Sequence, residues 1–349
     1  MAKTALITGV SGQDGAYLAK FLLDKDYRVV GGLRRSSSGG ISRLHELGIT
    51  DEIEFVDFDL AEHGNILRAL ARVRPDEIYN LAAQSYVALS FEQPLYTADT
   101  DGIGVMRILE SLREVVPSAR FYQASTSEMY GQARSTPQNE TTPFHPRSPY
   151  GIAKAFAHWA TVNYREAHGV AASCGILFNH ESPLRGREFV TRKITSSLAR
   201  IKRGQLDVLE LGNLNAERDW GYAGDYVEGM WLMLQRDEPE DFVLATGEAH
   251  SVRSFVTLAA RHLGFALEWS GRGIQERGID RSTGRTIVRV NPAFYRPAEV
   301  DVLIGDAGKA RRILGWAPKT GFAELVALMA EADERRVCDR IPANADLWV

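Results

Sequence analysis

A tyrosine and a lysine four residues apart, Tyr150 and Lys154, could form an acid–base pair. Because proline suits the first turn of a helix but not its interior, Pro149 predicts a helix that begins near Tyr150. A spacing of four then puts both side chains on one face. A nearby ammonium favours the phenolate and lowers the pKa of a tyrosine, so Tyr150 is expected to act as a base near neutral pH. Such a pair is common by itself, since core tyrosines and surface lysines also meet by chance.

A hydroxyl and a carboxylate earlier in the chain could complete this site. Thr126 and Glu128 lie in the stretch ASTSEMYG, directly after a strand-like segment. Side chains at the carboxyl edge of a parallel strand face the ligand crevice, so Thr126 is expected to hydrogen-bond a substrate oxygen beside Tyr150. Glu128 could remove a proton next to a newly formed ketone and then help a neighbouring hydroxyl leave as water. A carboxylate on a solvated turn is an equally good interpretation of the chemistry alone.

Short apolar strands alternate with helices through the first half of the chain. We expect strands at residues 3–8, 27–33, 53–58, 77–82, 120–125 and 171–178, and helices at 15–26, 66–73 and 100–115. This alternation indicates a parallel sheet with helices on both faces. Right-handed crossovers make it a doubly wound, Rossmann-like α/β fold.

A glycine-rich turn follows the first strand, with Gly9, Gly12 and Gly15 around Gln13 and Asp14. Glycines allow a tight turn and a close approach of the backbone to a pyrophosphate, which then lies at the N-terminus of the next helix. Such turns also serve purely for packing. The position between a strand and a helix favours dinucleotide binding.

The end of the second strand predicts which dinucleotide is bound. An NAD site usually has an acidic residue there, whereas this chain has Arg34 and Arg35 followed by serines. Guanidinium groups suit a 2′-phosphate, so NADP is expected rather than NAD, the other interpretation being a solvated basic loop. Asp59, after the third strand, could contact the adenine or simply cap a turn or helix.

Two unequal parts are expected. Residues 1–178 are predicted to be the NADP-binding domain, with a return of the chain near 212–246, and residues 179–349 to be mostly a smaller C-terminal substrate-binding lobe. The stretch 264–297 is rich in glycine and arginine and poorly periodic, so we interpret it as loop-rich.

The composition excludes several classes of protein. The 349 residues carry a net charge of −4, which gives no basic field for nucleic acid or acidic membranes. The two cysteines, Cys174 and Cys338, are far apart, so neither a disulfide framework nor a zinc or other metal site is expected. The chain has no apolar run long enough for a membrane span, and its first residues enter a strand directly, so a cytoplasmic location is expected.

Longer blocks of sequence resemble one known family in order and spacing. They are ALITGVSGQDGAYLA, RRSSS, NLAAQS, FYQASTSEMYG, PRSPYGIAKA, ILFNHESPLRG, EFVTRKIT, LGN…ERDWGYAGDYVE, NPAFYRPAEVD and ILGW. Together they resemble the GDP-mannose 4,6-dehydratases of the extended short-chain dehydrogenase/reductase superfamily, from near residue 3 to about residue 335. The blocks EFVTRKIT and NHESPLRG are specific to that family, whereas the glycine turn and the tyrosine–lysine pair are not.

The resemblance implies a set of site residues. The catalytic group would be Thr126, Glu128, Tyr150 and Lys154. NADP would be bound by Tyr150 and Lys154 together with Gly9, Gly12, Gln13, Asp14, Gly15, Arg34, Arg35, Ser36, Ser37, Asp59, Leu60, Leu81, Ala82, Ala83, Gln84, Ser85, Tyr96, His180 and Arg185. The sugar nucleotide would be bound by Thr126 and Glu128 together with Ser85, Asn179, Val190, Lys193, Arg218, Tyr295, Arg296 and Glu299. A purely structural histidine near the cofactor is our preferred interpretation of His180.

The resemblance also implies a reaction and an assembly. GDP-mannose would lose water to give GDP-4-keto-6-deoxymannose, with hydride leaving sugar C4 for NADP and returning at C6. A 4-epimerase or 4-reductase is the alternative, although neither needs a base at C5 and Glu128 therefore argues against both. A homo-oligomer, dimer or tetramer, would form through helices at 100–115 and 150–168. Departures from the family lie at Tyr86, in the continuation of the arginine loop and in the arginine-rich segment 271–289.

Overall fold

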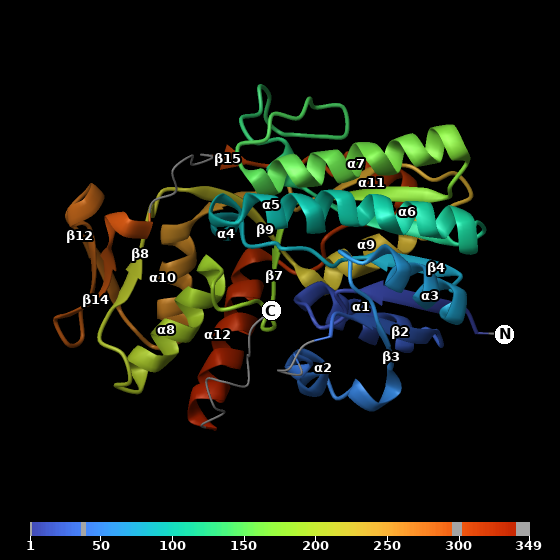
Figure 1. Ribbon diagram of the computed structural model, residues 1–349. Helices are drawn as coiled ribbons and strands as arrows, with labels where there is room; N and C mark the ends of the chain where they lie inside the picture. Colours follow the sequence, from blue (N-terminus) through green and yellow to red (C-terminus); the bar gives the residue numbers. More distant parts are fainter. Residues whose placement is uncertain (1, 36–39, 295–301, 340–349) are drawn as a thin grey trace.

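The computed structural model describes residues 2–35, 40–294 and 302–339, which form two lobes side by side (Figure 1). The larger lobe contains a parallel sheet of seven strands in the order β10-β6-β5-β4-β1-β2-β3. Its strands are β1 (Thr4–Thr8), β2 (Arg28–Leu33), β3 (Glu54–Asp57), β4 (Glu77–Asn80), β5 (Arg120–Thr126), β6 (Ala172–Leu177) and β10 (Phe242–Leu244). The expected doubly wound, Rossmann-like fold is confirmed.

Both faces of this sheet are covered by helices, as its apolar strands require. Ala5 and Ile7 of β1 belong to a core shared with α1 (Gln13–Leu23) and α9 (Ala223–Leu234). Leu6, on the opposite side of the same strand, belongs to a core shared with α3 (His63–Val73), α6 (Gly104–Val115) and α7 (Pro149–His168). Shorter helices are α2 (Ser42–Glu46), α4 (Val87–Glu92), α5 (Pro94–Ala98) and α11 (Gly308–Leu314).

The chain reverses its direction of travel across the sheet at β1, which pairs with β2 on one side and β4 on the other. In open α/β sheets, ligands bind at the carboxyl ends of the strands beside such a switch point. The turn after β1, the stretch after β4 and the end of β5 all open onto this edge.

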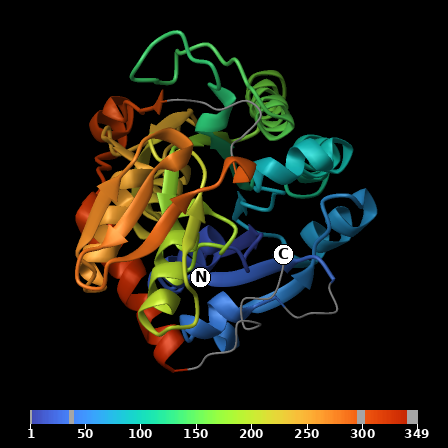
Figure 2. The same ribbon diagram turned by 90° about the vertical axis from the view of Figure 1, so that its left-hand side faces the viewer.

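The smaller lobe combines three helices with a twisted sheet (Figure 2). The helices are α8 (Val190–Lys202), α10 (Val252–His262) and α12 (Phe322–Cys338), and the sheet order is β12-β13-β14-β8. Its strands are β12 (Leu267–Ser270), β13 (Arg277–Asp280), β14 (Arg285–Val290) and β8 (Leu209–Leu211). A small third sheet is formed by β7 (Asn179–Glu181), β9 (Glu217–Tyr222), β11 (Ala249–Ser251) and β15 (Val302–Leu303).

The interpretation of residues 264–297 as loop-rich missed three strands, β12, β13 and β14, which lie within this segment. Antiparallel pairing joins β12 to β13 and β13 to β14. Leu267 and Trp269 alternate with the more exposed Glu268 and Ser270, so the sheet covers the lobe on one face only. Short strands with charged outer faces hid this period of two among glycines and arginines.

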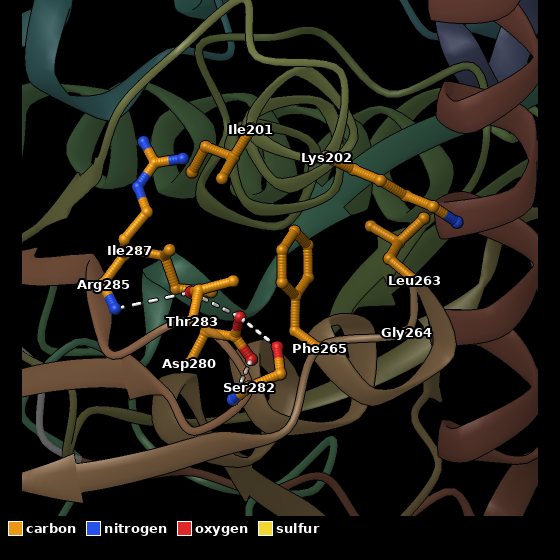
Figure 3. Close-up of a pocket in the computed structure, with 10 residues that line it drawn as sticks. All are labelled: Ile201, Lys202, Leu263, Gly264, Phe265, Asp280, Ser282, Thr283, Arg285 and Ile287. Atoms are coloured by element: carbon orange, nitrogen blue, oxygen red, sulfur yellow. Dashed lines mark hydrogen bonds between the residues drawn. The ribbon is translucent and has the colours of Figure 1, made fainter.

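A hollow at the end of α8 lies beside the β13–β14 turn (Figure 3). Its lining includes the carboxylate of Asp280, which accepts hydrogen bonds from the hydroxyls of Ser282 at 2.6 Å and Thr283 at 2.7 Å. These bonds tie the turn together, and none of the residues predicted for the functional site lines the hollow. Within the described segments, no helix is both long and apolar enough to cross a bilayer.

Candidate active site

The helix that carries Tyr150 and Lys154 begins where its sequence directs it to. Ser148 is the N-cap, its hydroxyl accepting a hydrogen bond from the Gly151 amide at 3.0 Å, and Pro149 is the first residue of α7. Tyr150 and Lys154 are both buried. A Cβ added at Gly151 would lie 2.7 Å from the carbonyl oxygen of Glu128, so only glycine lets this helix start pack against the end of β5.

Thr126, Glu128 and Tyr150 are brought together at that contact. The Thr126 hydroxyl accepts a hydrogen bond from the Glu128 amide at 3.2 Å and also hydrogen-bonds the phenol of Tyr150. The Glu128 carboxylate is near enough for its charge to act on Tyr150. A hydroxyl, a phenol and a carboxylate therefore share one side of the crevice.

The expected lowering of the pKa of Tyr150 by Lys154 is wrong for the protein alone. Burial raises the pKa of Tyr150 well above its usual value, and the charge of Asp101 raises it further, opposed by the hydrogen bond from Thr126. The Lys154 ammonium lies 5.8 Å from the centroid of the Tyr150 ring and donates to the carbonyl of Ala124 at 2.9 Å. Burial also lowers the pKa of Lys154. The spacing in the sequence predicted that Tyr150 and Lys154 share one helix face, but it carried no information on how deeply both are buried.

Asp101 is a member of this group that the sequence analysis missed. It is only 1% exposed, and its Oδ1 accepts a hydrogen bond from the Gln84 amide at 2.7 Å. Burial raises the pKa of Asp101 to about 6, an effect that the charge of Lys154 opposes. The only sequence signal was an aspartate among the apolar positions of a predicted helix.

The glycine turn has the tight geometry that a dinucleotide needs. Gly9 has a φ of +69°, and a Cβ there would lie 2.8 Å from the backbone nitrogen of Ala82. A Cβ at Gly15 would lie 2.3 Å from the carbonyl oxygen of Gly9, so α1 packs directly on the turn. The N-cap of α1 is Gly12, which offers no side-chain cap, so amide groups at this helix end suit a phosphate.

Gln13, Asp14 and His180 link this turn to the smaller lobe. The Gln13 amide donates to the His180 carbonyl at 3.1 Å, and its oxygen accepts from the Ser182 hydroxyl at 2.8 Å. The Asp14 carboxylate pairs with the His180 ring at 2.9 Å. Both nitrogens of His180 are thus engaged by protein acceptors, which agrees with a structural histidine beside the turn.

The other residues predicted to bind NADP lie around the same strand ends. Arg34 donates to the Tyr96 hydroxyl at 2.8 Å, so two residues far apart in sequence meet after β2. The Asp59 carboxylate accepts from the Ala61 amide at 3.0 Å and so caps a turn. Thr8 accepts from the amides of Leu81 and Ala82, fixing the stretch after β4 that continues through Ala83, Gln84 and Ser85. Arg35 is exposed, Leu60 is buried, and Ser36 and Ser37 lie outside the described residues.

The residues predicted to bind the sugar nucleotide come mostly from the smaller lobe. Asn179 begins β7 and Val190 begins α8. One turn further along α8, the Lys193 ammonium lies 3.5 Å from the centroid of the Phe294 ring, and burial lowers its pKa. Arg218, in β9, is buried and donates to the carbonyl of Glu217 at 2.8 Å. Tyr295, Arg296 and Glu299 lie outside the described residues.

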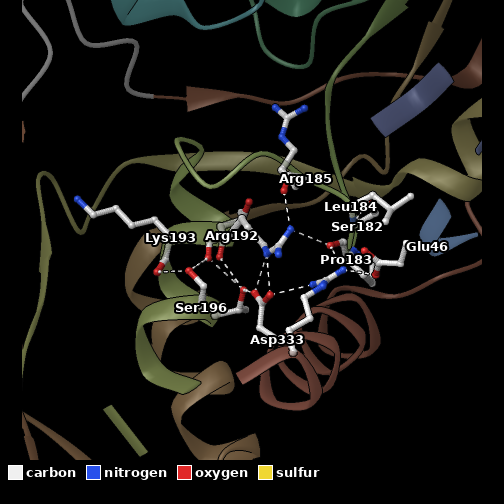
Figure 4. A network of polar contacts seen from close by, with 12 residues as sticks. Glu46, Ser182, Pro183, Leu184, Arg185, Arg192, Lys193, Ser196 and Asp333 are labelled. Carbon is white, nitrogen blue, oxygen red and sulfur yellow. Dashed lines mark hydrogen bonds and ion pairs between the residues drawn. The ribbon is translucent and has the colours of Figure 1, made fainter. Parts of the chain in front are cut away.

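Arg185 is held in place by a buried ion-pair network (Figure 4). Arg192 of α8 pairs with Asp333 of α12 at 2.7 Å and donates to the carbonyls of Pro183 and Arg185. Figure 4 shows the Arg185 side chain pointing away from this network. Its guanidinium stacks on Phe189, 3.6 Å from the ring centroid, and pairs with Glu181 at 3.1 Å. Its charge acts on both Tyr150 and Asp14.

Comparison with known proteins decides the family. A sequence model described as GDP-mannose 4,6 dehydratase matches residues 6–329. The GDP-mannose 4,6-dehydratase of Sinorhizobium fredii is 54% identical over 338 residues, which cover 95% of this chain and 96% of the relative. The human GDP-mannose 4,6 dehydratase is 52% identical, over 94% of this chain and 91% of the relative. The chain belongs to the GDP-mannose 4,6-dehydratase family.

Solved structures show how widely this fold is shared. A UDP-glucose 4-epimerase from Thermotoga maritima, solved with UDP-glucose, is 25% identical and superposes with a TM-score of 0.80 over 96% of this chain and 99% of the epimerase. The UDP-glucose 4-epimerase of Thermus thermophilus, solved in complex with NAD, gives 0.76 at 25% identity over 95% and 98%. The fold alone does not separate epimerases from dehydratases, whereas the family match does. The family and the enzymatic nature expected from the sequence are confirmed.

Proposed function

We propose that this protein is a lyase that converts GDP-mannose to GDP-4-keto-6-deoxymannose and water, with a bound NADP that is used and regenerated in each turnover. The observation that carries the proposal is the carboxylate of Glu128 beside the hydrogen-bonded pair of Thr126 and Tyr150. Oxidation at a sugar carbon needs only a base and a hydroxyl next to the nicotinamide. Dehydration needs a further group that removes the C5 proton and helps the C6 hydroxyl to leave, and a carboxylate fits that need.

A nicotinamide dinucleotide is the cofactor that fits the strand ends of the larger lobe. The crowded glycines at positions 9 and 15 and the uncapped start of α1 favour a pyrophosphate at the first turn. NADP rather than NAD is proposed because Arg34 and Arg35 follow β2 where an acidic residue would favour a ribose hydroxyl. The bond between Arg34 and Tyr96 supports this, since it orients a guanidinium at that strand end.

Proton transfer at C4 is assigned to Tyr150. The bound oxidised nicotinamide would supply a hydride acceptor and one positive charge. Together with the charge of Arg185, which lowers the pKa of Tyr150, that charge would favour the phenolate against the effect of burial. Tyr150 then accepts the C4 hydroxyl proton, while Thr126 hydrogen-bonds the same oxygen. Lys154, fixed to the Ala124 carbonyl, keeps an ammonium beside the phenol.

The next two proton transfers are assigned to Glu128. The C4 ketone acidifies the proton at C5, which Glu128 removes. The protonated carboxyl then donates to the C6 hydroxyl, which leaves as water. A proton must finally return to C5 as hydride reaches C6. The proton that Tyr150 took from the C4 hydroxyl balances this step, passed to C5 through solvent and the Glu128 carboxylate, so that both side chains end as they began.

The diphosphate and the guanosine are assigned to the smaller lobe. Lys193 and Arg218 provide positive charge on α8 and β9, and Arg296 is proposed with them from the sequence. The division into an NADP-binding domain, residues 1–178 with the return near 212–246, and a substrate lobe is part of this proposal. The cytoplasmic location stays a prediction.

A homo-oligomer is proposed from an apolar stripe on α7. Ile152, Phe156 and Trp159 are exposed at helical spacing, with 58%, 44% and 59% of their surface accessible. Leu95 of α5 is 84% exposed. An apolar surface of this kind marks an interface, and a second copy of the chain would cover it.

Mass spectrometry of GDP-mannose incubated with the protein and NADP tests the function. Loss of one water from the sugar nucleotide is expected. An unchanged mass with altered stereochemistry would instead identify a 4-epimerase. A 4-reductase would leave GDP-mannose unchanged and would add two hydrogens, from NADPH and a proton, only to a 4-keto sugar nucleotide supplied in its place.

A further inference from the structure

Asp101 is a buried carboxylate that no step assigned above uses. It lies in a π-helical turn, Asp99–Ile103, between α5 and α6. The helix expected at 100–115 therefore begins regularly only at Gly104. Oδ1 of Asp101 accepts a hydrogen bond from the backbone amide of Gln84. Its Oδ2 has no hydrogen-bond partner in the part of the chain that the structure describes. A buried carboxylate oxygen without a partner is costly, so a compensating charge or ligand is expected close by.

The π-helical turn brings Gly102, the residue after Asp101, against the catalytic helix. A Cβ added at Gly102 would lie 3.2 Å from a ring carbon of Phe156 and 3.6 Å from the carbonyl oxygen of Ala153, both in α7. Because Gly102 permits this approach, the neighbouring Asp101 lies where its charge acts on both Lys154 and Tyr150. Among the charges that favour ammonium at Lys154, that of Asp101 has the largest effect, followed by that of Asp14.

Lys154 needs such a partner because it is buried. Its ammonium has three donors, and the protein bond that is observed is to the carbonyl of Ala124. Burial by itself favours the neutral amine. A neutral Lys154 would no longer favour the phenolate of Tyr150.

We propose that Asp101 is a positioning residue whose buried carboxylate charge holds Lys154 as an ammonium and so sets the pH range in which Tyr150 and Lys154 work. The kinetic readout of this inference rests on the proposed function, but the stability readout does not. The other charged groups that face the pair are Asp14 from α1, Glu128 after β5 and Arg185 from the smaller lobe.

Removing the charge of Asp101 should shift the pKa values of Lys154 and Tyr150 in the same direction. Asp101 raises the pKa of Lys154 and also raises the pKa of Tyr150, so its loss lowers both. The alkaline limit of activity, where Lys154 loses its proton, and the acid limit, where Tyr150 gains one, should therefore both move to lower pH. A residue with only a packing role would lower the rate without moving either limit.

The first test is the pH profile of kcat for the holoenzyme. Asp101→Asn keeps an oxygen for the Gln84 amide and should move both limits to lower pH by about 1 unit or more. Asp99→Asn is the matched control, because Asp99 lies in the same turn but pairs with Arg107 at 2.8 Å, and it should leave both limits in place. Unmoved limits in Asp101→Asn, or equal shifts in both variants, would overturn the inference.

The second test uses thermal unfolding of the protein without substrate. At pH 8 the change in Tm of the double variant should differ clearly from the sum of the changes caused by Asp101→Asn and Lys154→Met alone. They should approach additivity at pH 5, because the pKa of Asp101 is raised to about 6 by burial and the carboxyl is then mostly neutral. Additivity at both pH values would overturn the inference even if the enzyme dehydrates GDP-mannose. If Asp101→Asn does not fold, the same comparison of single and double variants is made with Asp101→Ser, whose hydroxyl can replace one carboxylate oxygen.

Discussion

His180 and Asp14 form a largely buried ion pair, in which Nε2 of the imidazole lies 2.9 Å from Oδ2 of the carboxylate. The other ring nitrogen, Nδ1, lies 2.8 Å from the carbonyl oxygen of Phe178. Since both partners are acceptors, this geometry suits an imidazole with protons on both nitrogens, and the charge of Asp14 raises the pKa of His180 against the effect of burial. It stacks on Tyr226 at a centroid distance of 4.7 Å. The pair joins the glycine turn to the strand that leads into the smaller lobe.

We predict that Asp14→Asn destabilises the protein in a pH-dependent way. The pKa of Asp14 is lowered to about 2, chiefly by His180, so its contribution is present above pH 4 and lost as pH falls towards 2. The pKa of His180 is raised by Asp14, so its contribution is present below pH 6.5 and lost as pH rises through the raised value.

Denaturant unfolding at pH 3, 6 and 9 measures this effect. The loss should be greatest at pH 6, about 2 kcal/mol. Asp24→Asn, in the exposed pair with Lys20 at 3.7 Å, is the control and should change stability by less than about 0.5 kcal/mol. An equal loss at pH 3 and pH 6 would show that shape rather than charge matters at Asp14.

Changing Arg34 and Arg35 to alanine should reverse the preference for NADP. Each charge-assisted hydrogen bond to a phosphate contributes about 1.5–3 kcal/mol, so NADP binding should weaken by at least tenfold while NAD binding changes little. Isothermal titration with both cofactors measures this. Arg28→Ala is the control, since Arg28 lies at the far end of the same strand and pairs with Glu54 at 2.5 Å. Equal affinity of the unmodified protein for NAD and NADP would contradict the assignment.

Tyr150→Phe should abolish the whole reaction, because no base then remains at the C4 hydroxyl. Loss of a positioned acid–base group costs about 10²–10⁴ in rate. Single-turnover assays should show neither reduced cofactor nor product. Tyr164→Phe, further along α7 and hydrogen-bonded to Glu110, should keep normal turnover. Near-normal activity of Tyr150→Phe would move the base to another residue.

Glu128→Gln should stop the reaction after the first hydride transfer. The amide preserves shape, and removal of hydride from C4 precedes any need for the carboxylate, so reduced cofactor should accumulate with little product. Absorbance in the near ultraviolet reports the reduced nicotinamide. Wild-type enzyme in deuterated water should place deuterium at C5 of the product.

An exposed carboxylate on α7, Glu166, supplies the control for this variant. Glu166→Gln should turn over normally. Normal turnover of Glu128→Gln as well would mean that Glu128 is only a turn residue. Wild-type product without deuterium at C5 would argue against exchange of the abstracted proton with solvent.

Trp159→Glu should dissociate the oligomer, because it places a charge in the apolar stripe of α7. Light scattering should give a multiple of the mass of one chain for the wild type and a smaller mass for the variant. Arg72→Glu reverses the charge of an exposed side chain on α3 and should leave the assembly intact. A monomeric wild type at working concentration would refute the proposed oligomer.

Local signals in the sequence were enough to predict several parts of the site. Pro149 marked the start of α7, and the glycines between β1 and α1 marked a turn that tolerates no side chain at Gly9 or Gly15. These signals work because caps, turns and strand periods depend on neighbours a few residues away. The same reasoning failed for β12 to β14, where charged outer faces hid the alternation, and for the pKa of Tyr150, where spacing carried no information on burial.

The sequence by itself determined the alternating strands and helices of the larger lobe, the phosphate-suited turn, the chemical types at the candidate site and the family. Tertiary structure decided which distant groups meet: Asp14 with His180 across 166 positions and Arg192 with Asp333 across 141. It also decided that a π-helical turn holds Asp101 where its charge acts on Lys154. The physical reason is that local structure follows from nearby residues, whereas charge pairing and desolvation depend on how separate segments pack.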